Sequence, residues 1–124
     1  MTKLFLSIGS INAMLAVMLG AFGAHGLKSR LSAEMMEIFH TAVQYHFIHA
    51  LGLLAIGLVA YHLPESAWIR WSGWLLLAGI VIFSGSLYLL SISGVRWLGA
   101  VTPIGGLAFI AGWLLLTIGV LKGF

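Results

Sequence analysis

The sequence predicts an all-α, polytopic integral membrane protein in which four transmembrane helices form a bundle. Of its 124 residues, 61% are apolar and only 7% are charged, whereas soluble domains carry about 25% charged residues. Several runs of about 20 apolar residues match a hydrocarbon core about 30 Å thick, at a rise of about 1.5 Å per residue. A soluble chain of this length could not bury so much apolar surface, so residues 1–124 are expected to form one membrane domain.

The charge and the cysteine content exclude several classes of function. The net charge of +3 arises from six scattered Lys and Arg residues against three Glu residues, without the basic runs that bind nucleic acid. The positive excess is expected to meet the headgroups of membrane lipids. Because cysteine is absent, disulfides, thiolate metal sites and cysteine nucleophiles are excluded.

Four apolar segments predict the transmembrane helices, and the residues between them indicate where each helix ends. The second helix is expected to begin at Ala33, because Ser32 is a good N-cap and Glu34 and Glu37 lie near the positive end of the helix dipole. Its first turns form a short amphipathic segment at the headgroup level. Pro64 ends this helix, since proline cannot continue it. The four predicted spans are residues 4–24, 41–61, 72–92 and 98–121.

The sixteen glycines predict close contacts between helices, because helix association in lipid depends on close backbone approach. In the fourth span Gly105, Ala108, Gly112 and Gly119 follow a nearly heptad spacing. The first interpretation is tight packing inside one bundle. The second is that one small-residue ridge forms a homo-oligomer face or binds another membrane protein.

With four spans, both termini lie on the same side of the membrane, and this side is expected to be the cytoplasm. The distribution of basic residues does not decide the orientation, because each side carries the same number of them. Those on the side of the termini are Lys3, Arg70 and Lys122, and those on the other side are Lys28, Arg30 and Arg96.

The stretch HTAVQYHFIHAL, at residues 40–51, places polar side chains at the start of an apolar span. At about 100° per residue Tyr45, His46 and His49 share one helix face, which is expected to turn away from lipid because unpaired polar groups are costly there. Helix reversal brings polar residues of the other spans to the same side of the membrane. The sequence therefore predicts a one-sided polar pocket. Its candidate ligand-binding residues are His25, Tyr45, His46, His49, Ser84, Ser86, Tyr88 and Thr102.

The sequence leaves three interpretations of this pocket open. The polar side chains can hydrogen-bond between helices as structural contacts, each contributing less than about 1 kcal/mol. They can instead bind a small polar ligand, a quinone or a lipid headgroup. A metal site formed by His25, His46 and His49 is the third interpretation, although the sequence shows no carboxylate as a further ligand there.

Enzyme chemistry is not expected. The segment HFIHA lacks the glutamate of the H-E-x-x-H motif, and the carboxylates Glu34, Glu37 and Glu65 lie toward the connections. Neither a nucleophile elbow nor a glycine-rich phosphate loop is present. A small multidrug-type exporter is also not favoured, because no predicted span contains the carboxylate needed to couple protons. We therefore expect no catalytic residue, no metal and no cofactor.

Four segments carry a resemblance to a known family: GAFGAHGL, TAVQYHFIHAL, FSGSLYLL and TPIGGLAFIAGW, in this order. With them the chain resembles the YgdD-like family of small bacterial inner-membrane proteins, which is itself similar to a small eukaryotic transmembrane family. The resemblance covers essentially the whole chain and implies a four-span protein of the bacterial inner membrane. It implies no substrate, because the family carries a domain-of-unknown-function label.

The family pattern also bears on the candidate site. Glutamine is more common in the family at the position of His46, which argues against a metal site that needs two histidines in this segment. The recurring family residues correspond here to His25, Tyr45, His49, Ser84, Ser86, Tyr88, Thr102, Pro103 and Gly105.

Taken with the residues, the resemblance favours a non-enzymatic inner-membrane protein whose polar pocket binds a small ligand, a quinone or a lipid. The alternative is an assembly or accessory subunit that binds other membrane proteins through glycine-rich helix faces.

Overall fold

The computed structural model describes all residues from Met1 to Phe124, and it consists of helices joined by short connections. Helix α1 covers Thr2–Phe22 and α2 covers Ala33–His62. The third span is built from α3 (Ala67–Gly79) and α4 (Gly85–Ser93), and the last from α5 (Thr102–Gly123). The all-α fold predicted from the sequence is therefore confirmed.

Short turns of other helical types lengthen these helices into four continuous rods. A π-helical turn at Gly23–Leu27 extends α1, another at Ile80–Ser84 joins α3 to α4, and a 3₁₀ turn at Arg96–Ala100 precedes α5. The rods are 26, 30, 27 and 28 residues long, and each is apolar enough to cross a membrane. Each of the four predicted spans lies within one rod.

Polar contacts fix the start of α2 where the sequence predicts it. The Ser32 hydroxyl accepts a hydrogen bond from the Met35 backbone N–H at 3.2 Å, so the helix begins at Ala33. In the first turn Glu34 receives two hydrogen bonds from the Arg96 guanidinium, at 2.8 and 3.4 Å. This exposed ion pair links the first turn of α2 to the 3₁₀ turn that precedes α5.

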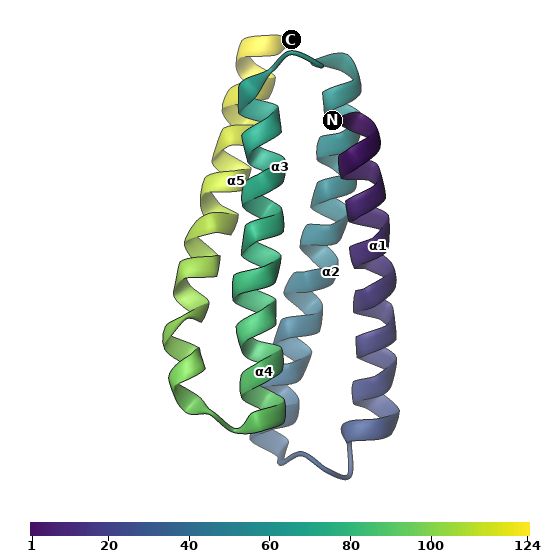
Figure 1. The fold of residues 1–124 in the computed structure, drawn as a ribbon, viewed down its shortest axis with the longest axis vertical. Helices are drawn as coiled ribbons and strands as arrows, with labels where there is room; N and C mark the ends of the chain where they lie inside the picture. Colours follow the sequence, from purple (N-terminus) through teal and green to yellow (C-terminus); the bar gives the residue numbers. More distant parts are fainter.

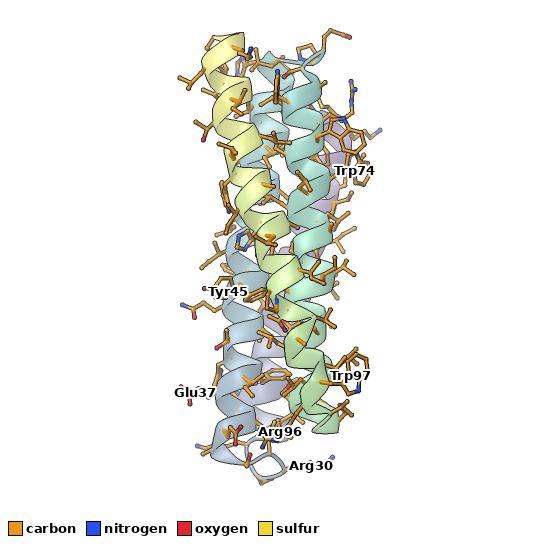
Figure 2. The ribbon with its side chains drawn as sticks, turned by 90° about the vertical axis from the view of Figure 1, so that its left-hand side faces the viewer. Arg30, Glu37, Tyr45, Trp74, Arg96 and Trp97 are labelled. Atoms are coloured by element: carbon orange, nitrogen blue, oxygen red, sulfur yellow. The ribbon has the colours of Figure 1, made fainter.

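The rods run alternately up and down, so the two termini lie at the same end of the molecule (Figure 1). Helix α1 packs along α2, α3 packs along α5, and α2 lies against α3 and α4 between them. Figure 2 shows Arg30, Glu37 and Arg96 near the opposite end, with Tyr45 farther along α2. This opposite end, formed by the first and third connections, is called the loop end below.

Glycines allow the helix backbones and large side chains to pack closely. A Cβ atom on Gly105 would lie 2.7 Å from the Phe83 Cα atom, and one on Gly112 would lie 2.7 Å from the Leu76 Cδ2 atom. A Cβ atom on Gly9 would lie 2.9 Å from the Leu54 backbone nitrogen. The glycine seam predicted in the last span is therefore occupied by contacts within the bundle.

Candidate functional site

His46 lies at the centre of a polar cluster that joins three helices. Its side chain is only 4% exposed. The imidazole Nδ1 atom lies 2.9 Å from the Tyr88 hydroxyl of α4, and the Nε2 atom lies 2.9 Å from the Asn12 Oδ1 atom of α1. Asn12 in turn donates its amide N–H to the Ile8 carbonyl at 2.9 Å. The polar face of α2 therefore turns inward, as the sequence predicts.

The directions of these hydrogen bonds define the tautomer of a neutral His46. The Ile8 carbonyl can only accept, so the Asn12 amide nitrogen faces it and the Asn12 Oδ1 atom faces His46. The His46 Nε2–H group then donates to Asn12, and the Nδ1 atom accepts from the Tyr88 O–H group. Both ring nitrogens are occupied.

His49 forms a second polar contact, one turn along the same face of α2. Its Nδ1–H group donates to the Tyr45 carbonyl at 2.7 Å, and its Nε2 atom accepts from the Trp113 indole N–H at 3.1 Å. The ring also stacks on Phe109 with a centroid distance of 3.5 Å. Since the carbonyl can only accept and the indole can only donate, the tautomer of His49 is fixed as well.

Three hydroxyl groups complete the cluster near the loop end. Ser84, which is fully buried, donates from the π-helical turn to the Ala42 carbonyl of α2 at 2.9 Å. Ser86 donates to the Phe83 carbonyl at 2.9 Å, and its oxygen lies 2.6 Å from the Thr102 hydroxyl of α5. The cluster thus links the second rod to each of the other three, and the third rod to the fourth, by side-chain hydrogen bonds.

Two of the eight predicted site residues do not join this network. His25 is exposed in the turn after α1 and forms no side-chain hydrogen bond. Tyr45 is 39% exposed, and its ring packs on Phe83 at a centroid distance of 4.5 Å while its hydroxyl remains unpaired. The other six residues all form side-chain hydrogen bonds in the cluster: His46, His49, Ser84, Ser86, Tyr88 and Thr102.

The structure does not show the predicted pocket among these residues. None of the eight lines any of the three crevices on the molecule. Every buried side-chain nitrogen or oxygen atom has a hydrogen-bond partner. The polar groups are thus closed over one another, because each has found a partner on a neighbouring helix or its own backbone.

The same hydrogen bonds bear on the metal interpretation. His25 is exposed and outside the network, and both ring nitrogens of His46 and of His49 are occupied by hydrogen bonds. No group of three His, Asp or Glu side chains is placed to hold a metal ion. A metal ion bound to the His49 Nε2 atom would have to displace the Trp113 indole.

Sequence reasoning missed Asn12 and Trp113, which supply essential partners of the two histidines. Asn12 is an amide in an otherwise apolar first span, and a strongly polar residue at such depth usually has a partner. That signal could have identified it. Trp113 carried no comparable signal, because a tryptophan in a membrane helix can either face lipid or pack between helices.

Two crevices outside the polar cluster follow one another along the seam between α1 and α2. The outer crevice, at the loop end, has a volume of about 650 Å³, and the inner one has a volume of about 660 Å³. Both volumes fall in the range of about 300–1,000 Å³ found for small-molecule sites. The outer crevice is lined by Ala24, Lys28, Leu31, Ala33, Met36, Glu37 and His40. The inner crevice is lined by Ala16, Val17, Gly20, Ala21, Val43, Gln44, Phe47 and Ile48.

The outer and inner crevices together are called the α1/α2 groove below. The lining of this groove changes in polarity along α2. Glu37 and His40 lie nearest the loop end, Gln44 lies one turn farther, and Phe47 and Ile48 lie deepest. Glu37 and Ile48 are separated by about 16 Å along the helix axis. The exposed Glu34–Arg96 pair one turn before Glu37 belongs at the headgroup level, so the groove runs from headgroups into the hydrocarbon.

A third crevice lies at the end of the molecule where the termini are. It is smaller, about 230 Å³, and its four lining residues are all apolar: Ala67, Trp68, Trp71 and Leu115. Tryptophans at this level are typical of the membrane interface.

Comparison with known proteins identifies the family. The family described as "Protein of unknown function (DUF423)" matches residues 19–106, more than half of the chain. The UPF0382 membrane protein YwdK of Bacillus subtilis (strain 168) is 48% identical over 120 residues, covering 97% of this chain and 98% of its own. UPF0382 membrane proteins of Staphylococcus saprophyticus and Staphylococcus epidermidis are 52% and 54% identical over 120 residues, with 97% of this chain covered and 98% and 97% of theirs.

No solved structure matches the chain. The family match and the full-length relatives agree with the four transmembrane rods described above. The chain therefore belongs to the DUF423 family of membrane proteins.

Proposed function

We propose that this protein is a non-enzymatic membrane protein that binds a phospholipid in the α1/α2 groove. The observation that carries the proposal is the graded lining of this groove, from charged side chains at the loop end to apolar side chains at depth. A phospholipid has the same order of groups along its length. The proposal keeps the expected ligand class and moves its site from the polar cluster to the opposite face of α2.

The position of Gln44 supports a bound lipid rather than casual contact with bulk lipid. Gln44 is exposed on the groove side, and its amide has no hydrogen-bond partner in the protein. In the outer part of the hydrocarbon an unpaired amide is costly, and water is scarce there. The ester carbonyls of a lipid lying in the groove would accept hydrogen bonds from this amide.

Selectivity in such a groove comes from shape and headgroup contacts. Lipid tails are about as apolar as leucine, so replacing one apolar contact by another gives little gain in free energy. Gly20 and Ala21 both line the inner crevice, and Val43 packs closely beside Gly20, where an added Cβ atom would lie 3.3 Å from the Val43 Cγ1 atom. An acyl chain in the inner crevice would lie beside the small, exposed side chain of Ala21.

The arrangement of hydroxyl groups supports a non-enzymatic role. Ser84 and Ser86 both donate to backbone carbonyls, and neither hydroxyl contacts a histidine. His46 and His49 are each held by two partners, so neither ring nitrogen is free to take a proton from a substrate. The cluster thus lacks a nucleophile paired with a base.

We further propose that the protein lies in the bacterial inner membrane with its termini in the cytoplasm. The terminal side carries three basic residues and one Glu, whereas the loop end carries three basic residues and two Glu. The basic residues are equal on the two sides, so the support for this orientation is the single additional Glu at the loop end, which is less suited to the anionic cytoplasmic leaflet. The test is to fuse two reporters in turn to the C-terminus, one active only in the cytoplasm and one active only in the periplasm. We expect the cytoplasmic reporter to be active, and activity of the periplasmic reporter would contradict this orientation.

The test of lipid binding is to fill the groove without touching the bundle core. Ala21→Trp places a large ring in the inner crevice, and Ala55→Trp places the same ring on an exposed position of α2 outside it. Native mass spectrometry in mild detergent would count the phospholipids retained by each variant. We expect the wild type and Ala55→Trp to retain one tightly bound lipid and Ala21→Trp to lose it. Equal retention by all three proteins would overturn the proposal.

A further inference from the structure

We infer that the outer crevice selects phospholipids whose headgroup carries both a phosphate and a primary ammonium group, that is, ethanolamine phospholipids. This inference rests on the proposed lipid-binding function and names the class of lipid. It comes from the charges at the loop end of the α1/α2 groove, which include a cation, an imidazole and a carboxylate: Lys28, His40 and Glu37.

The two glutamates at the start of α2 differ in their partners. Glu34 is held by Arg96 with an N–O distance of 2.8 Å, and this is the only ion pair in the molecule. Glu37 lines the crevice three residues later and has no cationic partner within the protein. Lys28, on the facing turn after α1, is likewise unpaired. The crevice therefore presents one free charge of each sign.

A headgroup with only a negative charge would satisfy half of this crevice. Its phosphate would bind Lys28 and receive a hydrogen bond from His40, but it would leave Glu37 unpaired beside an anion. A zwitterionic headgroup satisfies both signs, since its phosphate can bind Lys28 while its amine binds Glu37. Charge complementarity thus favours zwitterionic over anionic phospholipids.

The carboxylate also distinguishes between the two common zwitterionic headgroups. A primary ammonium group has three N–H donors, like a lysine side chain, and can form charge-assisted hydrogen bonds to Glu37. A trimethylammonium group has no N–H donor, and recognition of such a group typically uses a cage of aromatic rings. The outer crevice contains no aromatic residue other than the His40 imidazole. Ethanolamine is therefore favoured over choline.

The spacing along α2 agrees with the order of groups in the lipid. Glu37, His40 and Gln44 follow at intervals of three and four residues, so they lie on the same face of the helix. From the loop end inward they are expected to meet the ammonium group, the phosphate and the ester carbonyls, over about 10 Å of helix. The apolar inner crevice begins at the same depth as Gln44 and continues along the acyl chain.

The experiment is a competition between headgroups at constant acyl chains. Delipidated full-length protein in mild detergent is mixed with equimolar ethanolamine, glycerol and choline phospholipids, and native mass spectrometry measures the bound fraction of each. We expect the ethanolamine lipid to exceed the glycerol lipid about fivefold, near the upper end for one added exposed charge pair. We expect it to exceed the choline lipid as well, because only the primary ammonium group donates hydrogen bonds to Glu37. Equal binding of the three, or a preference for another headgroup, would overturn the inference.

Matched variants assign the preference to individual side chains. In Glu37→Gln the ethanolamine and glycerol lipids should bind about equally, while total lipid binding persists. Lys28→Gln should lower binding of every lipid, because each contains the phosphate. Glu65→Gln and Lys122→Gln, at the opposite end of the molecule, are the charge-matched controls and should change nothing. An ethanolamine preference that survives Glu37→Gln would also overturn the inference.

The two proposals fail in different ways. If Ala21→Trp and the wild type retain lipid equally, the groove is not the lipid site and both proposals fall. If Ala21→Trp loses lipid but the wild type does not discriminate between headgroups, lipid binding in the groove stands and the ethanolamine inference alone falls. All the variants replace exposed side chains, and their thermal unfolding in detergent checks that they remain folded.

Discussion

Helix α2 carries polar residues on two faces, and their surroundings differ. On the inner face His46 and His49 are almost fully buried, and each ring makes two hydrogen bonds. On the outer face His40 and Gln44 are exposed and have no side-chain partner in the protein. Within a membrane helix, polar groups that satisfy one another hold the fold together, and those left unpaired toward lipid are the ones free to bind a ligand.

This comparison also shows why a histidine-rich segment in a membrane helix need not line a pocket. Histidine, serine and tyrosine side chains at membrane depth need partners, and neighbouring helices provide them as readily as a ligand does. In this protein the bundle supplies all the partners of the inner face. The two crevices of the α1/α2 groove, in contrast, are lined by the side chains of Glu37, His40 and Gln44, for which the bundle supplies no partner.

The largest effect should follow from breaking the close helix contact beside the inner cluster. In Gly105→Ala the new Cβ atom would lie 2.7 Å from the Phe83 Cα atom, so α5 must move away from the π-helical turn that holds Ser84. We expect a loss of about 3 kcal/mol in the free energy of unfolding, at the upper end for overpacking. Thermal or denaturant unfolding in detergent would measure it.

The neighbouring glycine provides the control. A Cβ atom on Gly106 would lie 3.8 Å from the Phe83 Cδ2 atom, an ordinary contact, so Gly106→Ala should leave stability unchanged or slightly raised. Because Gly→Ala raises helix propensity, a similar loss in both variants would mean that the contact with Phe83 does not determine the result.

A smaller effect is expected from removing the hub of the inner cluster. His46→Leu leaves the Tyr88 hydroxyl and the Asn12 amide oxygen without their partner, at a cost of about 2 kcal/mol. His46→Gln should cost less, because its amide can donate to Asn12 and accept from Tyr88. The account of His46 as a structural hub requires this order of stabilities in unfolding measurements, and the reverse order would contradict it.

The smallest effect concerns the single hydrogen bond between His49 and Trp113. His49→Phe keeps a ring to stack on Phe109 but loses the acceptor for the indole N–H. A double-mutant cycle with Trp113→Phe should give a coupling energy of about 0.6 kcal/mol, typical of hydrogen bonds between membrane helices. A cycle of His49→Phe with the distant Trp68→Phe should give no coupling energy. Equal coupling energies in both cycles would mean that the hydrogen bond between His49 and Trp113 does not contribute to stability.

Much of the fold could be predicted from the sequence, because the bilayer restricts the solutions. Hydrophobic length and helix periodicity identified the spans, and the Ser32 cap placed the start of α2 correctly. The π-helical turn at Ile80–Ser84 was not predicted. It depends on the tertiary hydrogen bond from Ser84 to Ala42, and no local pattern encodes that bond.

The candidate site was harder to predict than the fold. Periodicity showed correctly that His46 and His49 share an inward face, but it could not show that Asn12 and Trp113 would occupy their ring nitrogens. Whether polar groups enclose a cavity depends on packing between rods, which residue types alone do not determine. The groove was not predicted for the same reason, since it depends on how the side chains of α1 and α2 pack against each other.

One crossed measurement tests most directly the claim that the inner cluster is structural and the outer groove binds lipid. Thermal unfolding and lipid retention by native mass spectrometry would be recorded on the same preparations of His46→Gln and Ala21→Trp. The account requires His46→Gln to unfold at a lower temperature and keep its lipid, and Ala21→Trp to lose its lipid while remaining as stable as the delipidated wild type. Loss of lipid from a folded His46→Gln protein, with lipid retained by Ala21→Trp, would contradict the account and return the binding site to the polar cluster.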